Sequence, residues 1–241
     1  MNFQKGAFVM PVDNPAKSLT QATYERLRKD VLSCALAPGS RVNVKELAEA
    51  YEASGGAVRE ALSRLTSEDL VLSEPQKGFR IAPISFADLR DLTLARIEIE
   101  GMCLRQSIEN GDVSWEARLV SAYHSLSRAP GPESGENYEE IQWNSAHSTF
   151  HEALVSACPN SWLSRLRKMM FEQNSRYRAL SVSITAGDRD LTSEHRQLLD
   201  AALARDADVA VALIGEHIRQ TSAVLMRELQ SFEALGEQPR A

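Results

Sequence analysis

The sequence of 241 residues has few cysteines and no long apolar run. Its three cysteines, Cys34, Cys103 and Cys158, lie far apart and form no CxxC pair, which indicates free thiols in a reducing compartment. No stretch approaches about 18 consecutive apolar residues, so no membrane span is expected. The first residues also lack the charged start and apolar run of a signal peptide. These absences predict a cytoplasmic protein with no membrane partner.

Excess positive charge is also lacking, because the formal net charge at pH 7 is -6. Residues 18–84 carry as many acidic as basic side chains, so the acidic surplus lies in the rest of the chain. This balance argues against sequence-independent coating of nucleic acid. It leaves a specific DNA site open, since a basic face rather than the total charge decides that property.

The segment from Val44 to Arg80 contains two short helical patterns followed by two strand-like runs. Apolar spacing predicts a helix over Val44–Tyr51, and Ser54 is placed to cap a second helix after a tight glycine-containing turn. Residues 71–73 and 79–81 read as strands joined by a turn through Pro75–Gly78. Helix, turn, helix and a two-stranded wing is the arrangement that sets a helix into the DNA major groove.

This segment resembles the winged-helix domain of the GntR superfamily of bacterial transcription regulators. The residues that carry the resemblance are Pro38-Gly39, Lys45-Glu46-Leu47-Ala48, Val58-Arg59-Glu60-Ala61-Leu62, Arg64-Leu65, Leu70-Val71 and Lys77-Gly78. The resemblance implies DNA contacts from Lys45, Ser54, Arg59, Arg64, Lys77 and Gly78. The alternative is a structural helix pair with no DNA role.

One departure from the family lies at Gly55 and Gly56, where its members usually carry Arg and Thr. Two side chains that often touch DNA are therefore missing. The amides of Gly55 and Gly56, at the start of a helix, are still suited to bind a phosphate. Recognition of DNA bases is expected to depend more on Arg59 here than in most members of the family.

Pro83 cannot continue a strand ladder, and Ser85 after it is placed to cap a helix. The remaining apolar patterns are all helical and predict an antiparallel helical bundle. The chain is thus expected to be mainly α, with a winged helix-turn-helix domain over 18–84 and an all-helical bundle over 85–232. Flexible tails are expected over 1–17 and 233–241. The six predicted helices are Phe86–Glu109, Ser114–Arg128, Asn137–Ala157, Asn160–Ser181, Thr192–Ala204 and Asp206–Phe232.

Four of the five histidines fall on predicted helices of the bundle in a pattern that suits a metal site. His147 and His151 are four residues apart and therefore share one helix face. His195 and His217 lie on the last two helices. Imidazoles from three helices can meet inside a bundle and bind a metal. The alternative for each is a hydrogen-bonded core histidine.

The sequences Phe150-His151-Glu152-Ala153-Leu154 and Glu194-His195-Arg196, together with His217, resemble the ligand-sensing FCD domain of the FadR subfamily. Many members bind a divalent metal there with one Asp and three His, and His147 occupies the Asp position. Four imidazoles favour zinc, nickel or copper over manganese, and zinc or nickel is the expected metal. Four neutral ligands also leave the site more positive than a carboxylate would, which favours an anionic effector.

The resemblance adds Arg96, on the first helix of the bundle, as a partner for an effector carboxylate. Arg176 and Arg178, on the helix after Asn160, are further candidates because Arg pairs with carboxylates in a bidentate manner. For each arginine the alternative is a surface salt bridge.

Three functions remain open. The first, which we favour, is a homodimeric repressor that binds an inverted repeat in double-stranded DNA and is released by a small carboxylate, with dicarboxylates such as glutarate among the candidates. The second is a metal-dependent hydrolase, although His147-Ser148-Thr149-Phe150-His151 lacks the Glu of HExxH. The third is a regulator whose bundle only dimerises.

Overall fold

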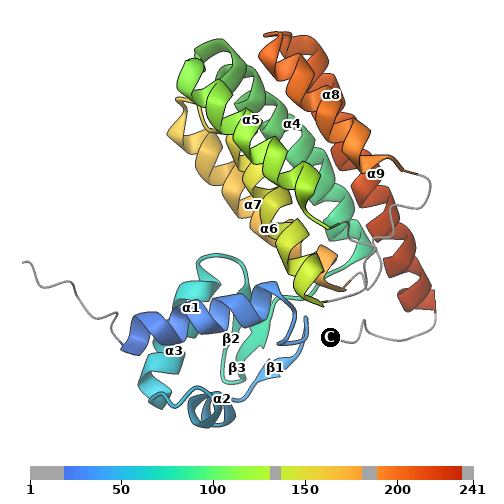
Figure 1. Cartoon of the computed structure of the whole chain (residues 1–241). Helices are drawn as coiled ribbons and strands as arrows, with labels where there is room; N and C mark the ends of the chain where they lie inside the picture. The colour runs from blue at the N-terminus through green and yellow to red at the C-terminus, as the bar shows by residue number, and fades with distance from the viewer. Residues whose placement is uncertain (1–18, 131–136, 181–188, 235–241) are drawn as a thin grey trace, which may run out of the picture. The chain divides into compact units, whose positions relative to one another are not determined.

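The computed structural model describes residues 19–130, 137–180 and 189–234 (Figure 1). The predicted tail 1–17 lies outside these residues, as do residues 235–241 of the second predicted tail. Chain packing separates a first unit, residues 19–29 and 41–80, from a second unit, residues 30–40 and 81 onward. Within the described residues, no helix is long and apolar enough to cross a membrane.

The first unit contains three helices, α1 (Leu19–Leu32), α2 (Val44–Ala50) and α3 (Gly55–Thr66). Capping side chains determine where α2 and α3 begin. Asn43 accepts a hydrogen bond from the Lys45 amide at 3.0 Å, and Ser54 accepts one from the Ala57 amide at 3.1 Å. The apolar positions predicted for α3 are its buried ones, Val58, Ala61, Leu62 and Leu65. The predicted helix pair is therefore confirmed.

A three-stranded sheet completes this unit, with β1 (Arg41–Val42), β2 (Val71–Glu74) and β3 (Gly78–Ile81) in the order β1-β3-β2. The β2–β3 hairpin is the predicted wing. Gly78 has φ +85°, a backbone conformation that favours glycine. Arg80 Nε donates to Glu74 Oε1 at 2.7 Å and closes the hairpin. Strand β1, which the sequence did not predict, pairs antiparallel with β3 through Arg41 and Arg80.

The second unit is the predicted helical bundle. Ser85, Asp112 and Asp190 cap α4, α5 and α8 through their side-chain oxygens. The described helices are α4 (Phe86–Asn110), α5 (Val113–Arg128), α6 (Asn137–Val155), α7 (Ser161–Leu180), α8 (Leu191–Leu203) and α9 (Ala207–Ala234). Helix α9 thus extends two residues past the predicted domain end at Phe232.

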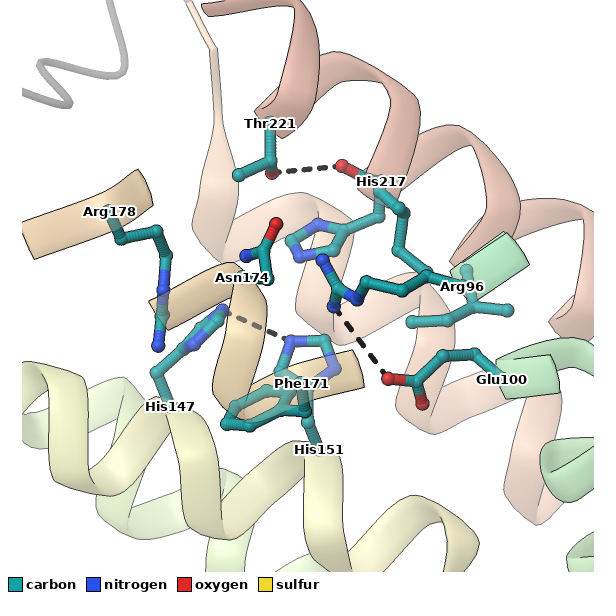
Figure 2. Close-up of a pocket in the computed structure, with 11 residues that line it drawn as sticks. Arg96, Glu100, His147, His151, Phe171, Asn174, Arg178, His217 and Thr221 are labelled. Atoms are coloured by element: carbon teal, nitrogen blue, oxygen red, sulfur yellow. Dashed lines mark hydrogen bonds and ion pairs between the residues drawn. The ribbon is translucent and has the colours of Figure 1, made fainter. Parts of the chain in front are cut away.

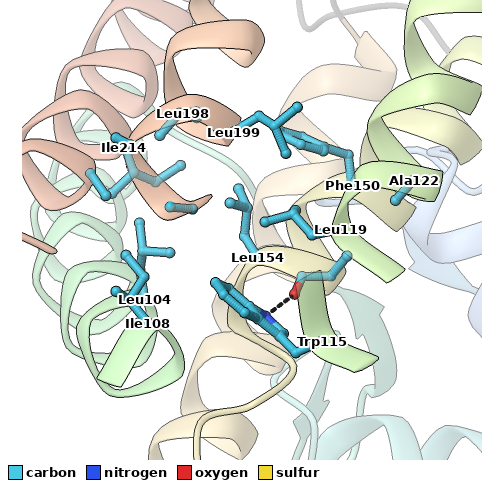
Figure 3. Close-up of a cluster of buried hydrophobic side chains, with 14 of the residues drawn as sticks. Leu104, Ile108, Trp115, Leu119, Ala122, Phe150, Leu154, Leu198, Leu199 and Ile214 are labelled. Atoms are coloured by element: carbon cyan, nitrogen blue, oxygen red, sulfur yellow. Dashed lines mark hydrogen bonds between the residues drawn. The ribbon is translucent and has the colours of Figure 1, made fainter. Parts of the chain in front are cut away.

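The core of the bundle is formed by five of its helices and supports the site described below (Figure 3). Trp115 of α5 is fully buried and donates its indole N–H to the Ala153 carbonyl at 2.9 Å. Phe150, on α6, has its ring centroid 5.9 Å from that of Tyr123. Helix α4 packs along α9 and against α7, and α8 packs on α9. These contacts bring α6, α7, α8 and α9 around one interior point.

Candidate metal and effector site

The four histidines that the sequence singled out meet inside the bundle. His147 and His151 project from α6, His195 from α8 and His217 from α9, and all four are buried. One ring nitrogen of each lies within 4.8 Å of those of the other three. The Nε2 atoms of His147 and His151 are 3.0 Å apart. Spacing along α6 brings the first two together, whereas the packing of α8 and α9 adds the others.

Outer hydrogen bonds orient two of these rings. His217 Nδ1 lies 2.8 Å from Glu194 Oε2, and Arg189 holds the same carboxylate through Nε at 3.0 Å and Nη2 at 2.6 Å. A carboxylate on Nδ1 fixes the proton there, which leaves Nε2 of His217 as a lone-pair donor. His195 makes a hydrogen bond to the backbone of Leu191. Its Nε2 is buried without a partner.

Charge within the cluster follows from its burial. Burial, together with the neighbouring imidazoles, lowers the pKa of His147 and of His151 well below the usual value. Burial and His217 lower the pKa of His195 to about 3. Burial would raise the pKa of Glu194, but hydrogen bonds from His217 and Arg189 outweigh it and lower that pKa to about 2. Neutral imidazoles at His147, His151 and His195, beside an ionised Glu194, suit a divalent metal, which binds deprotonated ligands.

The donor set fits a zinc-like ion. His195 Nε2 is buried with no hydrogen-bond partner in the described part of the chain, and the Nε2 atoms of His147 and His151 face each other at 3.0 Å. Tetrahedral zinc with nitrogen ligands at about 2.0–2.1 Å places those nitrogens about 3.3 Å apart. The ring nitrogens lie within 4.8 Å of one another, so a bound ion would require the more distant ones to move inward. Four histidines would therefore hold the ion, and His147 stands at the position where the family resemblance implies an Asp.

A pocket of about 360 Å³ empty volume, including its open mouth, adjoins the cluster. Figure 2 shows His147, His151 and His217 on its wall together with Arg96, Glu100, Asn174 and Arg178. Glu100 Oε2 accepts from Arg167 Nε at 2.7 Å, and its Oε1 lies 3.7 Å from Arg96 Nη2. One buried carboxylate thus faces two buried guanidinium groups. Sequence reasoning missed Glu100, although its i,i+4 spacing from Arg96 was visible.

Arg96 and Arg178 both line this pocket. Within the described ranges, the Nε atoms of both arginines are buried without a hydrogen-bond partner, and so is Oδ1 of Asn174. Burial, followed by the charge of Arg96, lowers the pKa of Arg178 to about 10. Buried polar atoms of this kind usually have partners, and the predicted contact of the two arginines with an effector carboxylate stays a prediction.

Arg176 is not among the residues that line this pocket, and its predicted contact with an effector stays a prediction. Its guanidinium Nη2 donates to the Ala82 carbonyl, and Nη1 donates to Gln173 Oε1 at 3.1 Å. Arg176 and Arg178 are two residues apart on α7, so their side chains project from different faces of the helix.

The predicted DNA-contacting residues lie on the first unit. Lys45, Ser54, Gly56, Arg59, Lys77 and Gly78 are exposed, whereas Gly55 and Arg64 are half-buried. Arg64 Nη1 donates to Gln21 Oε1 at 3.0 Å, and its guanidinium lies 3.6 Å from the Tyr24 ring centroid, so it also ties α3 to α1. A side chain at Gly55 would contact Arg59, whose Nη1 lies 3.5 Å from the position of an added Cβ.

Comparison with known proteins identifies both parts of the chain. The family model for bacterial regulatory proteins of the gntR family matches residues 19–81, and the FCD domain model matches residues 91–220. The chain belongs to the GntR family of transcription regulators. Its C-terminal FCD domain places it with the FadR-like members, as the sequence resemblance implied.

Three similar proteins support this assignment. The HTH-type transcriptional regulator BphR of Paraburkholderia xenovorans is 42% identical over 90% of this chain and 88% of its own length. The HTH-type transcriptional repressor GlaR of Escherichia coli is 32% identical over 81% of this chain and 90% of its own. The solved structure of E. coli McbR/YncC, at 25% identity, covers 88% of this chain and 98% of that chain with a TM-score of 0.72. These relatives are transcription regulators rather than enzymes, which argues against the hydrolase alternative.

Proposed function

We propose that this GntR-family regulator represses its target genes and releases DNA when a small dicarboxylate binds beside a metal held by His147, His151, His195 and His217. The observation that carries the proposal is the position of Arg96 and Arg178 on the same pocket wall as the histidines. A divalent ion would supply a Lewis-acidic position for one carboxylate of the ligand. The two arginines would receive the other carboxylate.

Charge balance favours a dianion over a monoanion. The pocket wall carries two positive guanidinium groups and the single negative charge of Glu100, and Arg167 behind it adds a further positive charge. Four neutral imidazoles leave the full charge of a divalent ion in place. Buried positive charge of this size is costly unless anionic groups compensate it. Asn174 Oδ1, which has no partner, is available to a hydroxyl, amino or water donor on the ligand side.

We propose α3 as the recognition helix that enters the DNA major groove. Arg59 is exposed on it, with Lys45 on α2 and Lys77 on the wing as further basic groups. Arginine bidentate to guanine is the commonest specific contact in the major groove. A homodimer would place two such helices on an inverted repeat. Repression agrees with GlaR, a relative that is named as a repressor.

Thermal unfolding tests the effector site directly. Zn²⁺-loaded protein is melted with each linear mono- and dicarboxylate from two to six carbons, and again after chelation of the metal. A ligand at a hundred times its dissociation constant adds about 2.7 kcal/mol to the unfolding free energy. We expect the largest shift with a dicarboxylate and none after chelation.

Two variants refine the test. Arg178→Met keeps the apolar stem of the side chain and should abolish the dicarboxylate shift, while Lys168→Ala, at an exposed position of the same helix, should leave it unchanged. A shift that survives chelation would refute direct binding at the metal. If no acid stabilises the protein, the result favours the alternative of a bundle that only dimerises. The DNA-binding assignment is unaffected.

A further inference from the structure

Helix α7 carries two sets of side chains within a single turn. Asn174 and Arg178 are one turn apart and line the pocket. Arg176 and Tyr177 lie between them and contact residues of the segment that connects β3 to α4. A continuous helix is stiff over one turn, so a displacement at Asn174 or Arg178 is shared by the residues between them.

Arg176 holds the beginning of this connecting segment. Its side chain is 2% exposed, and its guanidinium donates to the Ala82 carbonyl and to the Gln173 side chain. Among the described residues, the hydrogen-bond partners of this guanidinium are neutral groups, and its Nε has no partner. A buried cation without an ion pair stabilises a fold poorly. Its position on the Ala82 carbonyl therefore suggests a role other than stability.

Tyr177 holds the other end of the segment. Its hydroxyl donates to the Asp88 carboxylate and accepts from the Ser85 amide at 3.4 Å. Ser85 is the N-cap residue of α4, and Asp88 lies in the first turn of that helix. The ring of Tyr177 packs with Leu89 of α4 in a small buried cluster. The hydroxyl of Tyr177 thus fixes the start of α4 relative to α7.

From this arrangement, and resting on the proposed function, we infer that Arg176 and Tyr177 are positioning residues that couple the effector pocket to DNA affinity. Ligand contacts at Asn174 and Arg178 shift α7. The shift moves the Ala82 carbonyl and the cap of α4 through Arg176 and Tyr177. Coupling of this kind requires the ligand to bind the two positions of α7 with different affinity.

The test separates coupling from binding. Two variants of the full-length protein are prepared. Tyr177→Phe keeps the packed ring, and Arg176→Met keeps the buried stem of the side chain. Lys168→Ala, on the exposed face of α7, is the control. Calorimetry measures Zn²⁺ and glutarate affinity. Titration of an operator selected from random DNA measures DNA affinity with and without these ligands. Hydrogen exchange follows the amides of residues 84–92.

In the wild type and in Lys168→Ala we expect glutarate with Zn²⁺ to weaken operator binding by about 5-fold or more, the usual range of allosteric coupling. In Tyr177→Phe and Arg176→Met the ligand affinities and the ligand-free operator affinity should be retained, while the weakening falls to about 2-fold or less. The ligand-induced change in exchange over residues 84–92 should vanish with it. Undiminished coupling in Tyr177→Phe, or unaltered exchange of this segment in the wild type, would overturn the inference.

Failure of the proposed function gives a different result. If calorimetry detects no binding of glutarate or of any other linear dicarboxylate from two to six carbons, the effector assignment fails, and the pocket is perturbed by Arg178→Met instead. The inference then requires Arg178→Met to change operator affinity in the wild-type background but not in the Tyr177→Phe background. Equal effects in both backgrounds would refute the coupling role of Tyr177.

Discussion

Glu194 offers a sharp test of the metal site, because it hydrogen-bonds a proposed ligand, His217, without being a proposed ligand itself. Its carboxylate hydrogen-bonds His217 Nδ1 at 2.8 Å. It also accepts hydrogen bonds from Arg189 Nη2 at 2.6 Å and from Arg189 Nε at 3.0 Å. Replacement by glutamine in Glu194→Gln keeps the size of the side chain but removes the charge that fixes the His217 tautomer. Loss of such an outer partner typically weakens metal binding by about 10- to 100-fold, or about 1.4–2.7 kcal/mol.

The measurement must distinguish metal affinity from folding. Loss of charge-assisted hydrogen bonds also lowers the stability of the metal-free protein, by about 1.5–3 kcal/mol each at most. Zn²⁺ affinity is therefore measured by competition with a chelator, at a temperature where each variant is folded. The control is Glu216→Gln, which alters an exposed carboxylate one residue before His217 that pairs with Arg219 at 3.0 Å.

We expect Glu194→Gln to bind Zn²⁺ more weakly and Glu216→Gln to match the wild type. Equal Zn²⁺ affinities of Glu194→Gln and the wild type would refute the argument that Glu194 prepares His217 as a ligand. Equal losses in both variants would point to the overall charge of α9 and α8, and not to the hydrogen bond.

Three further predictions concern the DNA face, the core and the thiols. Arg59→Ala should weaken operator binding by about 1–3 kcal/mol and relax base preference, as measured by titration with matched and mismatched operators. Phe150→Ala should lower the unfolding free energy by about 3–5 kcal/mol in denaturant titration, because the ring is fully buried; a change below 1 kcal/mol would contradict that packing. Iodoacetamide at pH 8 should label Cys158 before Cys34, since burial raises the pKa of Cys34 to about 11 and encloses its sulfur, whereas Cys158 is half-buried; faster labelling of Cys34 would refute this order.

Local sequence was sufficient wherever neighbours along the chain determine structure. Ser54 caps α3 as predicted because a hydroxyl three residues before an amide needs no distant partner. His147 and His151 share a face of α6 for the same reason. Strand β1 could not be predicted in this way, because two residues carry no periodicity and become a strand only by pairing with β3.

Tertiary packing decided the content of the site. Arg176 and Arg178 are indistinguishable in the sequence as basic residues of one helix, and the orientation of α7 alone places Arg178 in the pocket and Arg176 on the Ala82 carbonyl. Glu100, Arg167 and Asn174 belong to helices whose mutual contacts no local pattern reveals.

By itself, the sequence determined the family, the winged helix, the helical bundle and the four histidines. These features depend on residue type and on spacing within one element, and both can be read from the sequence. The tertiary structure decided which arginines line the pocket beside the histidines and which carboxylate orients His217. It also decided which residues of α7 hold the start of α4. Such contacts depend on the rotation and packing of whole helices, to which residues far apart in the chain contribute together.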